Sequence, residues 1–94
     1  MSNYFTRKIK WYLGKYDIGY KYWINIDDII IKPDFVECVP KQKKMEQKWK
    51  YYRKNDEFES HILLDKNFIL VDGYTSYIIA KTEGMSKVPV YFVD

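Results

Sequence analysis

The feature that most constrains the fold is an apolar run that meets a glycine and then continues as an amphipathic segment. Residues 68–71 form a short run of strand-forming side chains, and Asp72-Gly73 is a turn signal. From Tyr74 onward the apolar residues recur at helical spacing. These patterns predict a buried strand that turns at Gly73 directly into a helix.

A turn of this kind has a defined chemistry. The first N–H groups of a helix have no partner within the helix and lie at the positive end of its dipole, so they favour a phosphate or a carboxylate. We therefore expect Gly73, Tyr74, Thr75 and Ser76 to bind a phosphate. The alternative is that Asp72, Thr75 or Ser76 only caps the helix, which requires no ligand.

A second segment, residues 41–54, is strongly basic. It holds seven lysines and arginines against one glutamate, a charge of +6 in a chain whose total is +3. Met45, Trp49 and Tyr52 recur at helical spacing, which predicts a helix with one stripe packed inward, and Pro40 suits its first turn. The residues expected to contact a nucleic-acid backbone or a partner are Lys41, Lys43, Lys44, Lys48 and Arg53. The alternative is a solvated face that only keeps the protein soluble.

The first 23 residues hold eight aromatic side chains. Period-two patterning over residues 4–13 and 20–26 predicts an N-terminal β-hairpin. Because side chains alternate between the faces of a strand, some aromatics should be exposed, as at protein interfaces and on platforms that stack single-stranded nucleic acid. Trp11 and Tyr16 are the hairpin residues expected to contact a partner, unless these aromatics serve only the fold.

The rest of the chain completes an α+β fold. Residues 61–64 and 68–71 flank a short polar turn and predict a second hairpin, and residues 55–60 read as a loop. Gly84 suits the end of the helix that begins at Tyr74, and residues 88–93 predict a closing strand with Pro89 at an edge or near the strand start. Ninety-four residues suit one domain, with residues 1–23 as the hairpin extension and 24–94 as the core.

The order of these elements from Ile24 to Val93 resembles the ParB/sulfiredoxin-like superfamily, and in particular the short ParB-like domains of low-GC bacteria and their phages. The resemblance rests on residues 26–33 (IDDIIIKP), 40–54, 61–74 (HILLDKNFILVDGY) and 88–93 (VPVYFV). It implies a small mixed sheet with two helices. It also implies that the glycine turn binds a phosphate of a nucleotide or nucleic acid.

The sequence departs from this superfamily directly after the glycine. Members usually carry a glutamate or histidine there, followed by one or two arginines that hold phosphate, whereas this chain has Tyr74, Thr75 and Ser76. A hydroxyl replaces neither the charge nor the bidentate grip of a guanidinium. Sulfiredoxin chemistry would need a cysteine beside the turn, and Cys38 lies far upstream. The sequence therefore favours binding over catalysis and offers no catalytic residue.

Composition narrows the remaining classes of function. One cysteine cannot form an intramolecular disulfide, and neither Cys38 nor His61 has the spacing of a metal site, so we expect no cofactor or metal. No apolar run reaches the roughly 20 residues of a membrane span, and the N-terminus lacks the apolar centre of a secretory signal. We expect a cytoplasmic protein of a bacterial host cell, without membrane partners.

Two hypotheses of different class follow. In the first, a catalytically degenerate ParB-like domain binds nucleic-acid or nucleotide phosphate through the Gly73 turn and the basic helix. In the second, a phage or mobile-element accessory protein binds and inhibits a host protein of a nucleic-acid defence system through the aromatic hairpin and the basic helix. The basic helix favours the first hypothesis, and the missing arginines favour the second.

Overall fold

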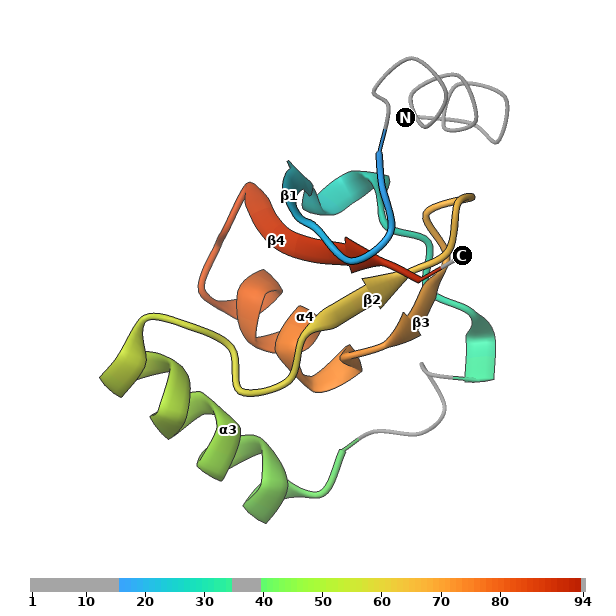
Figure 1. Cartoon of the computed structure of the whole chain (residues 1–94). Coiled ribbons are helices and arrows are strands. Elements are labelled where there is room, and N and C mark those ends of the chain that lie inside the picture. Colours follow the sequence, from blue (N-terminus) through green and yellow to red (C-terminus); the bar gives the residue numbers. More distant parts are fainter. Residues whose placement is uncertain (1–15, 35–39, 94) are drawn as a thin grey trace.

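The computed structural model describes residues 16–34 and 40–93. Two α-helices lie entirely within these residues and accompany a four-stranded mixed sheet, an α+β architecture that confirms the predicted fold class (Figure 1). The elements in chain order are β1 (Lys21–Asn25), the 3₁₀ turn η1 (Ile26–Asp28), α3 (Gln42–Asn55), β2 (Ile62–Leu64), β3 (Leu70–Asp72), α4 (Tyr74–Thr82) and β4 (Lys87–Phe92).

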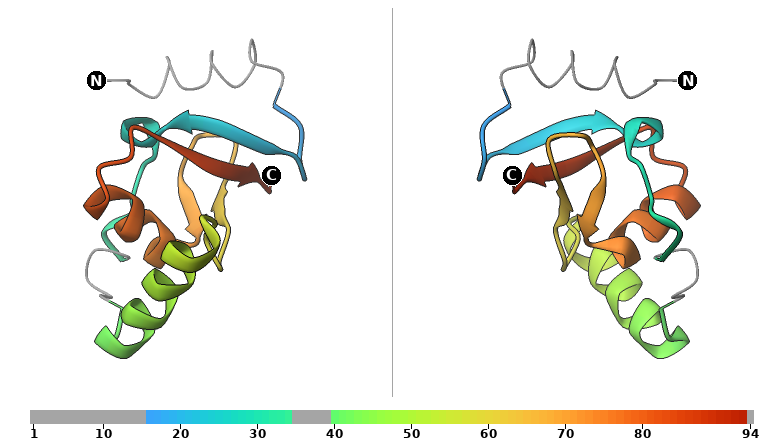
Figure 2. Two further views of the ribbon diagram at one scale, coloured as in Figure 1. Left: turned by 90° about the vertical axis from the view of Figure 1, so that its left-hand side faces the viewer. Right: turned by 90° about the vertical axis from the view of Figure 1, so that its right-hand side faces the viewer.

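The last strand of the chain is an interior strand of the sheet. The strand order is β1-β4-β2-β3, with β4 antiparallel to β1 and parallel to β2, and with β2 antiparallel to β3. The β1–β4 pair runs at a steep angle to the β2–β3 pair, as the twist of a sheet produces (Figure 2). Strand β4 therefore joins the beginning of the described chain to the second hairpin.

Pro89 is the third residue of β4 and lies opposite Trp23 of β1. The amide of Ile26 donates to the carbonyl of Ser86 at 3.0 Å. Because hydrogen-bonded and non-hydrogen-bonded residue pairs alternate along an antiparallel ladder, the nitrogen of Pro89 points away from β1. On that other side, pairing with β2 begins only at Val90. A proline is therefore tolerated in an interior strand because it stands before the second ladder starts, which agrees with its predicted place near the strand start.

One face of the sheet carries the core. Its buried side chains come from all four strands, and α4 adds Ile79 and Ala80 above β2. Helix α4 packs against the sheet and α3 packs against α4 (Figures 1 and 2). Helix α3 has no buried residue, and its predicted inward stripe of Met45, Trp49 and Tyr52 is only half-buried.

Three predicted boundaries are tested at the helix ends. Helix α4 begins at Tyr74 as predicted. At its other end Gly84 has a φ of +74°, its amide donates to the carbonyl of Lys81, and the amide of Met85 donates to the carbonyl of Ala80, which confirms the glycine stop. The prediction for Pro40 was wrong: Lys41 is the N-cap of α3, so the proline precedes the first turn.

The second hairpin is confirmed, but its return strand starts later than predicted. Strand β3 begins at Leu70, because Phe68 adopts a left-handed conformation with a φ of +65°. The Phe68 ring is buried, with its centroid 5.3 Å from that of Phe92. Asp65 supports the turn by accepting the amides of Asn67 and Ile69. Burial of a phenylalanine contributes about 1.5–3 kcal/mol, enough to offset a left-handed residue.

Only part of the predicted N-terminal hairpin falls within the described residues. Its predicted second strand, residues 20–26, is confirmed as β1, which pairs with β4. The predicted first strand, residues 4–13, and Trp11 lie outside the described residues. Tyr16 is described, and its ring lies 4.8 Å from the rings of Tyr22 and Phe92, so it packs against the core.

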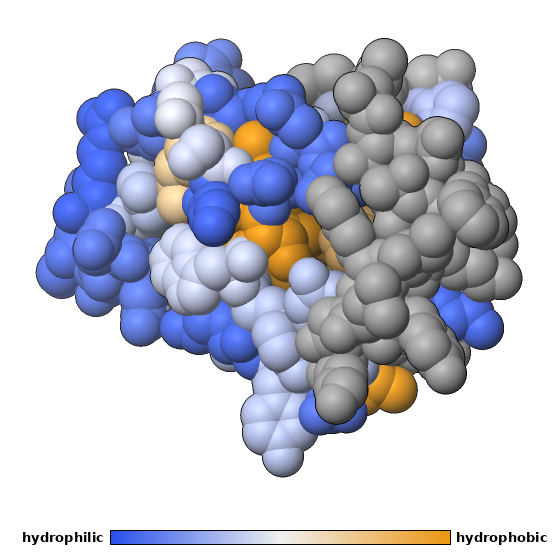
Figure 3. Space-filling view, turned by 90° about the horizontal axis from the view of Figure 1, so that it is seen from above, coloured by the Kyte–Doolittle hydropathy of each residue, from blue (hydrophilic) through white to orange (hydrophobic). Residues whose placement is uncertain are grey.

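On the face seen from above, the coloured residues are mostly hydrophilic around a small hydrophobic centre (Figure 3). Within the described ranges, no helix has both the length and the apolar character needed to cross a bilayer.

Candidate functional site

Gly73 forms the tight turn between β3 and α4. Its φ is +88°, and a Cβ added there would lie 2.3 Å from the carbonyl oxygen of His61 and 2.8 Å from the Cα of Ile62. Backbone atoms cannot move aside as the tip of a side chain can. Only a glycine allows the start of α4 to pack directly on the start of β2.

The first turn of α4 is left without a side-chain cap. Gly73 occupies the N-cap position and makes no side-chain cap hydrogen bond, and the amide of Tyr77 is the first to donate back, to the Gly73 carbonyl at 3.0 Å. Asp72 accepts the amide of Gly73 itself at 2.8 Å. The amides of Thr75 and Ser76 therefore lie in the first turn, where the helix offers them no acceptor.

Ser76 serves the packing of this turn. Its side chain is 1% exposed, and its hydroxyl donates to the carbonyl of Ser60 at 2.6 Å. This hydrogen bond fastens α4 to the segment that precedes β2. The structure thus gives the Ser76 hydroxyl an internal partner, whereas the neighbouring Thr75 reaches the surface groove described next.

A groove of about 240 Å³, here called the turn groove, opens at the start of α4. It brings residues of the glycine turn together with two lysines of α3, although some 25 to 30 positions separate them in the sequence. Lys48 donates from its ammonium group to the hydroxyl of Ser60 at the groove wall. The lining residues are Pro40, Lys44, Lys48, Ser60, Asp72, Gly73, Tyr74 and Thr75.

Five of the eleven predicted binding residues line this groove: Gly73, Tyr74, Thr75, Lys44 and Lys48. Ser76, Lys41, Lys43, Arg53 and Tyr16 do not, and Trp11 lies outside the described residues. The lining carries two lysines and one carboxylate, Asp72, so its formal charge favours an anion. Ser60 was missed by the sequence prediction, because a serine in a polar loop gives no signal of the two hydrogen bonds it makes here.

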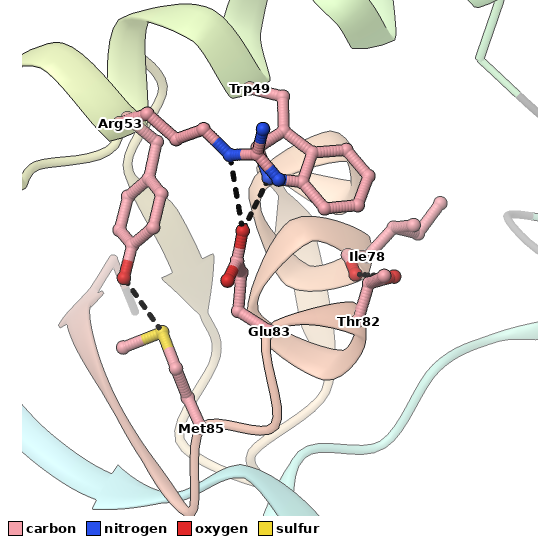
Figure 4. Close-up of polar contacts among 7 residues, drawn as sticks. Trp49, Arg53, Ile78, Thr82, Glu83 and Met85 are labelled. Atoms are coloured by element: carbon pink, nitrogen blue, oxygen red, sulfur yellow. Dashed lines mark hydrogen bonds and ion pairs between the residues drawn. The ribbon is translucent and has the colours of Figure 1, made fainter.

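Arg53 is engaged in holding α3 against α4 (Figure 4). Its Nε lies 3.6 Å from Oε1 of Glu83, and its guanidinium lies 5.4 Å from the centre of the Trp49 ring. The Trp49 indole N–H donates to the same Glu83 oxygen at 2.5 Å. The positions of Lys44 and Lys48 over the turn groove therefore depend on this attachment.

Tyr52 makes a further contact between α3 and the end of α4. Its hydroxyl lies 3.6 Å from the sulfur of Met85. Burial raises the pKa of Tyr52, and the nearby carboxylates of Asp56 and Glu83 raise it further. The phenol therefore stays protonated and uncharged at neutral pH.

The described residues offer no cluster of three metal-ligating side chains. His61 lies beside Tyr91, with ring centroids 4.7 Å apart, and Cys38 lies outside the described residues. The chemistry supported by this arrangement is anion binding by amides and ammonium groups.

No protein-family model matches the sequence, and no curated protein matches it. Solved structures do. The chain is similar to a pNOB8-like ParB N-domain, with a TM-score of 0.66 and 25% sequence identity over 80% of this chain and 30% of that one.

Two further structures share the fold at lower identity. One is the C-terminally truncated chromosome-partitioning protein ParB from Caulobacter crescentus complexed with CTP-gamma-S, with a TM-score of 0.61 and 17% identity over 81% of this chain and 45% of that chain. The other is a free serine kinase in complex with AMP, with a TM-score of 0.63 and 18% identity over 84% and 33%. The present chain thus spans less than half the length of each of these proteins.

Proposed function

We propose, for a chain that belongs to the ParB/sulfiredoxin-like superfamily, that the turn groove binds a phosphate group of a nucleotide or nucleic acid. One observation carries this proposal. The groove unites the uncapped first turn of α4 with Lys44 and Lys48 of α3. Backbone amides and positive charge at one point are the usual means of holding phosphate.

The two lysines take the place of the arginines that the superfamily usually carries after the glycine. They reach the phosphate from α3 across the groove, while the arginines would come from α4 itself. An ammonium group acts as a point charge and lacks the planar fork of a guanidinium. We therefore expect weaker binding that depends strongly on salt, because exposed charges are screened within about 8 Å at physiological ionic strength.

The proposed role is binding without hydrolysis. Asp72 is the one carboxylate of the groove lining, and its Oδ1 accepts the amide of Gly73. A carboxylate held in this way supports the turn. The lysines supply charge and hydrogen bonds to the phosphate but no leaving-group chemistry.

The test is a titration of the whole chain with CTP, AMP and pyrophosphate at low salt. Binding is monitored through the NMR chemical shifts of the amides of residues 73–76. The nucleotides are chosen because two structures of the same fold were solved with CTP-gamma-S and with AMP. Neutralising both groove lysines, as Lys44→Gln with Lys48→Gln, should weaken binding about tenfold, or about 1.4 kcal/mol. Lys54→Gln is the matched control, since Lys54 is exposed on α3 and does not line the groove.

A duplex DNA oligonucleotide tests the nucleic-acid form of the proposal. Affinity should fall with salt at a slope of about −0.9 per phosphate contacted, and the double lysine variant should flatten that slope. Binding of none of these probes at low salt would overturn the proposal, as would an equal loss of affinity in the Lys54→Gln control.

A further inference from the structure

A second cavity, of about 310 Å³, opens on the face of the sheet opposite the core. Strand register places it there: Trp23 lies opposite Pro89 and Lys21 opposite Tyr91, whereas the alternating residues Ile24 and Val90 point into the core. The C-terminal end of α3 and the following loop close it. This aromatic pocket is lined by Lys21, Trp23, Tyr52, Asp56, Glu57, Phe58, His61, Ile62, Met85, Pro89 and Tyr91.

Five of its eleven lining residues carry aromatic rings. Tyr52 and Phe58 stack with centroids 5.0 Å apart and planes at 17°. His61 and Tyr91 form a second pair at 4.7 Å. Trp23 completes the wall and is 58% exposed, a large indole that the described fold leaves open to solvent. These rings come from β1, α3, the loop after α3, the start of β2 and β4.

Two carboxylates give the pocket its charge. Asp56 and Glu57 line it against one lysine, Lys21, in a protein whose total charge is +3. The backbone of Asp56 is held by the end of α3, where the residue adopts a left-handed conformation and its amide donates to the Tyr52 carbonyl at 2.8 Å. Among the described residues, the ion pairs engage Asp27 and Glu83 and neither of these two carboxylates.

Aromatic faces together with carboxylates recognise organic cations. A guanidinium can stack on an aromatic ring while its edge N–H groups donate to a carboxylate, which gives cation–π and charge-assisted contacts at once. The protein already contains one such arrangement, in which Arg53 lies over Trp49 and pairs with Glu83. A nucleotide would instead bring its phosphate toward the two carboxylates.

We propose that the aromatic pocket receives an arginine side chain of a partner protein. The charge of the pocket selects the cation, and Trp23 with the two ring pairs supplies the stacking surfaces. This proposal does not depend on the turn groove, which has the opposite charge. The two sites can therefore be tested separately in the same sample.

The test uses the whole chain and N-acetyl-arginine amide, a probe that mimics an arginine within a polypeptide, monitored by NMR. Shifts should appear at the Trp23 indole and at residues 56–58 and 61, with millimolar affinity. N-acetyl-citrulline amide has nearly the same shape without the charge and should bind several-fold more weakly. Equal binding of the two probes, or shifts located elsewhere, would overturn the proposal.

Variants distinguish a loss of binding at the pocket from a loss of the fold. Asp56→Asn with Glu57→Gln should lower arginine-amide affinity at least fivefold and leave the rest of the spectrum in place, since asparagine tolerates the left-handed conformation at position 56. Trp23→Ala should remove binding, whereas Tyr20→Ala should not, because Tyr20 is 65% exposed and outside the pocket. Unchanged affinity in the carboxylate variant would refute the idea.

Two further probes distinguish other ligands. Free L-arginine that binds more tightly than the capped amide would assign the pocket to a small molecule and overturn a protein partner. CTP that shifts the Trp23 indole and displaces the arginine amide would assign it to a nucleobase, with the same consequence. The variant with Lys44→Gln and Lys48→Gln should lose CTP binding and keep arginine-amide binding. This result would show that the two sites bind their ligands independently.

Discussion

The turn groove and the aromatic pocket lie on either side of residues 60–62, but the protein builds them in different ways. The turn groove is shaped by buried backbone: Gly73 touches the backbone of His61 and Ile62, and Ser76 is bonded to the carbonyl of Ser60. The aromatic pocket is lined by side chains that stand on a finished sheet and a helix end. The first site therefore shares its determinants with the fold, and the second largely does not.

The two regions also differ in sign of charge. The groove lining holds Lys44 and Lys48 against Asp72, and the pocket lining holds Asp56 and Glu57 against Lys21. Ligands of opposite charge can thus be bound a short distance apart without competing. A variant that affects one region through charge should leave the other unchanged, and a variant that affects both should act through the fold.

The largest expected effect is that of Gly73→Ala. The new methyl group would overlap the His61 carbonyl and force a left-handed alanine, so we expect a loss of about 3 kcal/mol or more of unfolding free energy. Urea denaturation measures it. Gly84→Ala is the control, since Gly84 also has a positive φ, of +74°, but nothing lies within 4 Å of the added Cβ.

The control should lose only about 1 kcal/mol, the cost of placing alanine in a left-handed conformation. A Gly73→Ala protein as stable as Gly84→Ala would mean that the turn does not rest on the start of β2. The shape of the turn groove would then not depend on the packing that stabilises the fold.

This contrast explains what the sequence can predict. The Gly73 turn is local: an apolar run, a glycine and a helical period are adjacent in the chain, and the helix begins at Tyr74 as predicted. The closing strand and the second hairpin are local in the same sense. Their residue order also sufficed for the resemblance to the ParB/sulfiredoxin-like superfamily.

The remaining features depend on contacts between distant residues. The rings of the aromatic pocket come from positions 23, 52, 58, 61 and 91, and only strand register and the docking of α3 bring them together. Ser60 gains its role from Lys48 and Ser76, which no local pattern reveals. Phe68 leaves the predicted strand because its ring enters the core, a case of tertiary packing that overrides strand propensity.

The second prediction compares a small substitution at the turn with a large one at the pocket. Ser76→Ala should cost about 1–2 kcal/mol of unfolding free energy, because it leaves the half-buried Ser60 carbonyl without its donor. Trp23→Ala removes far more atoms but should cost no more than about 0.5 kcal/mol, since the indole is largely exposed. Thermal or urea unfolding decides the order, and a larger loss for Trp23→Ala would contradict the contrast between the two regions.

The third prediction concerns Glu83, which serves both regions through α3. Glu83→Gln should cost about 1 kcal/mol, because it removes the charge that holds Arg53 and weakens the bond from Trp49. Since α3 supplies Lys44 and Lys48 to one site and Tyr52 and Asp56 to the other, phosphate and arginine-amide affinities should both fall a few-fold. Thr82→Ala, next to Glu83 on the exposed surface, is the control and should spare both affinities.

The smallest effect is the most discriminating. Asp72→Asn removes the negative charge from the turn groove and keeps an Oδ1 that can accept the Gly73 amide, so phosphate affinity should rise about two- to fivefold, as expected for one partly exposed charge. Glu57→Gln makes the same change of charge at the aromatic pocket. Glu57→Gln should leave phosphate affinity unchanged and lower arginine-amide affinity. Asp72→Asn should raise phosphate affinity and leave arginine-amide affinity unchanged. Titration of both variants with both probes gives four affinities. If either substitution moved both ligands equally, the two regions would share one electrostatic field, and the separation argued from their linings would be wrong.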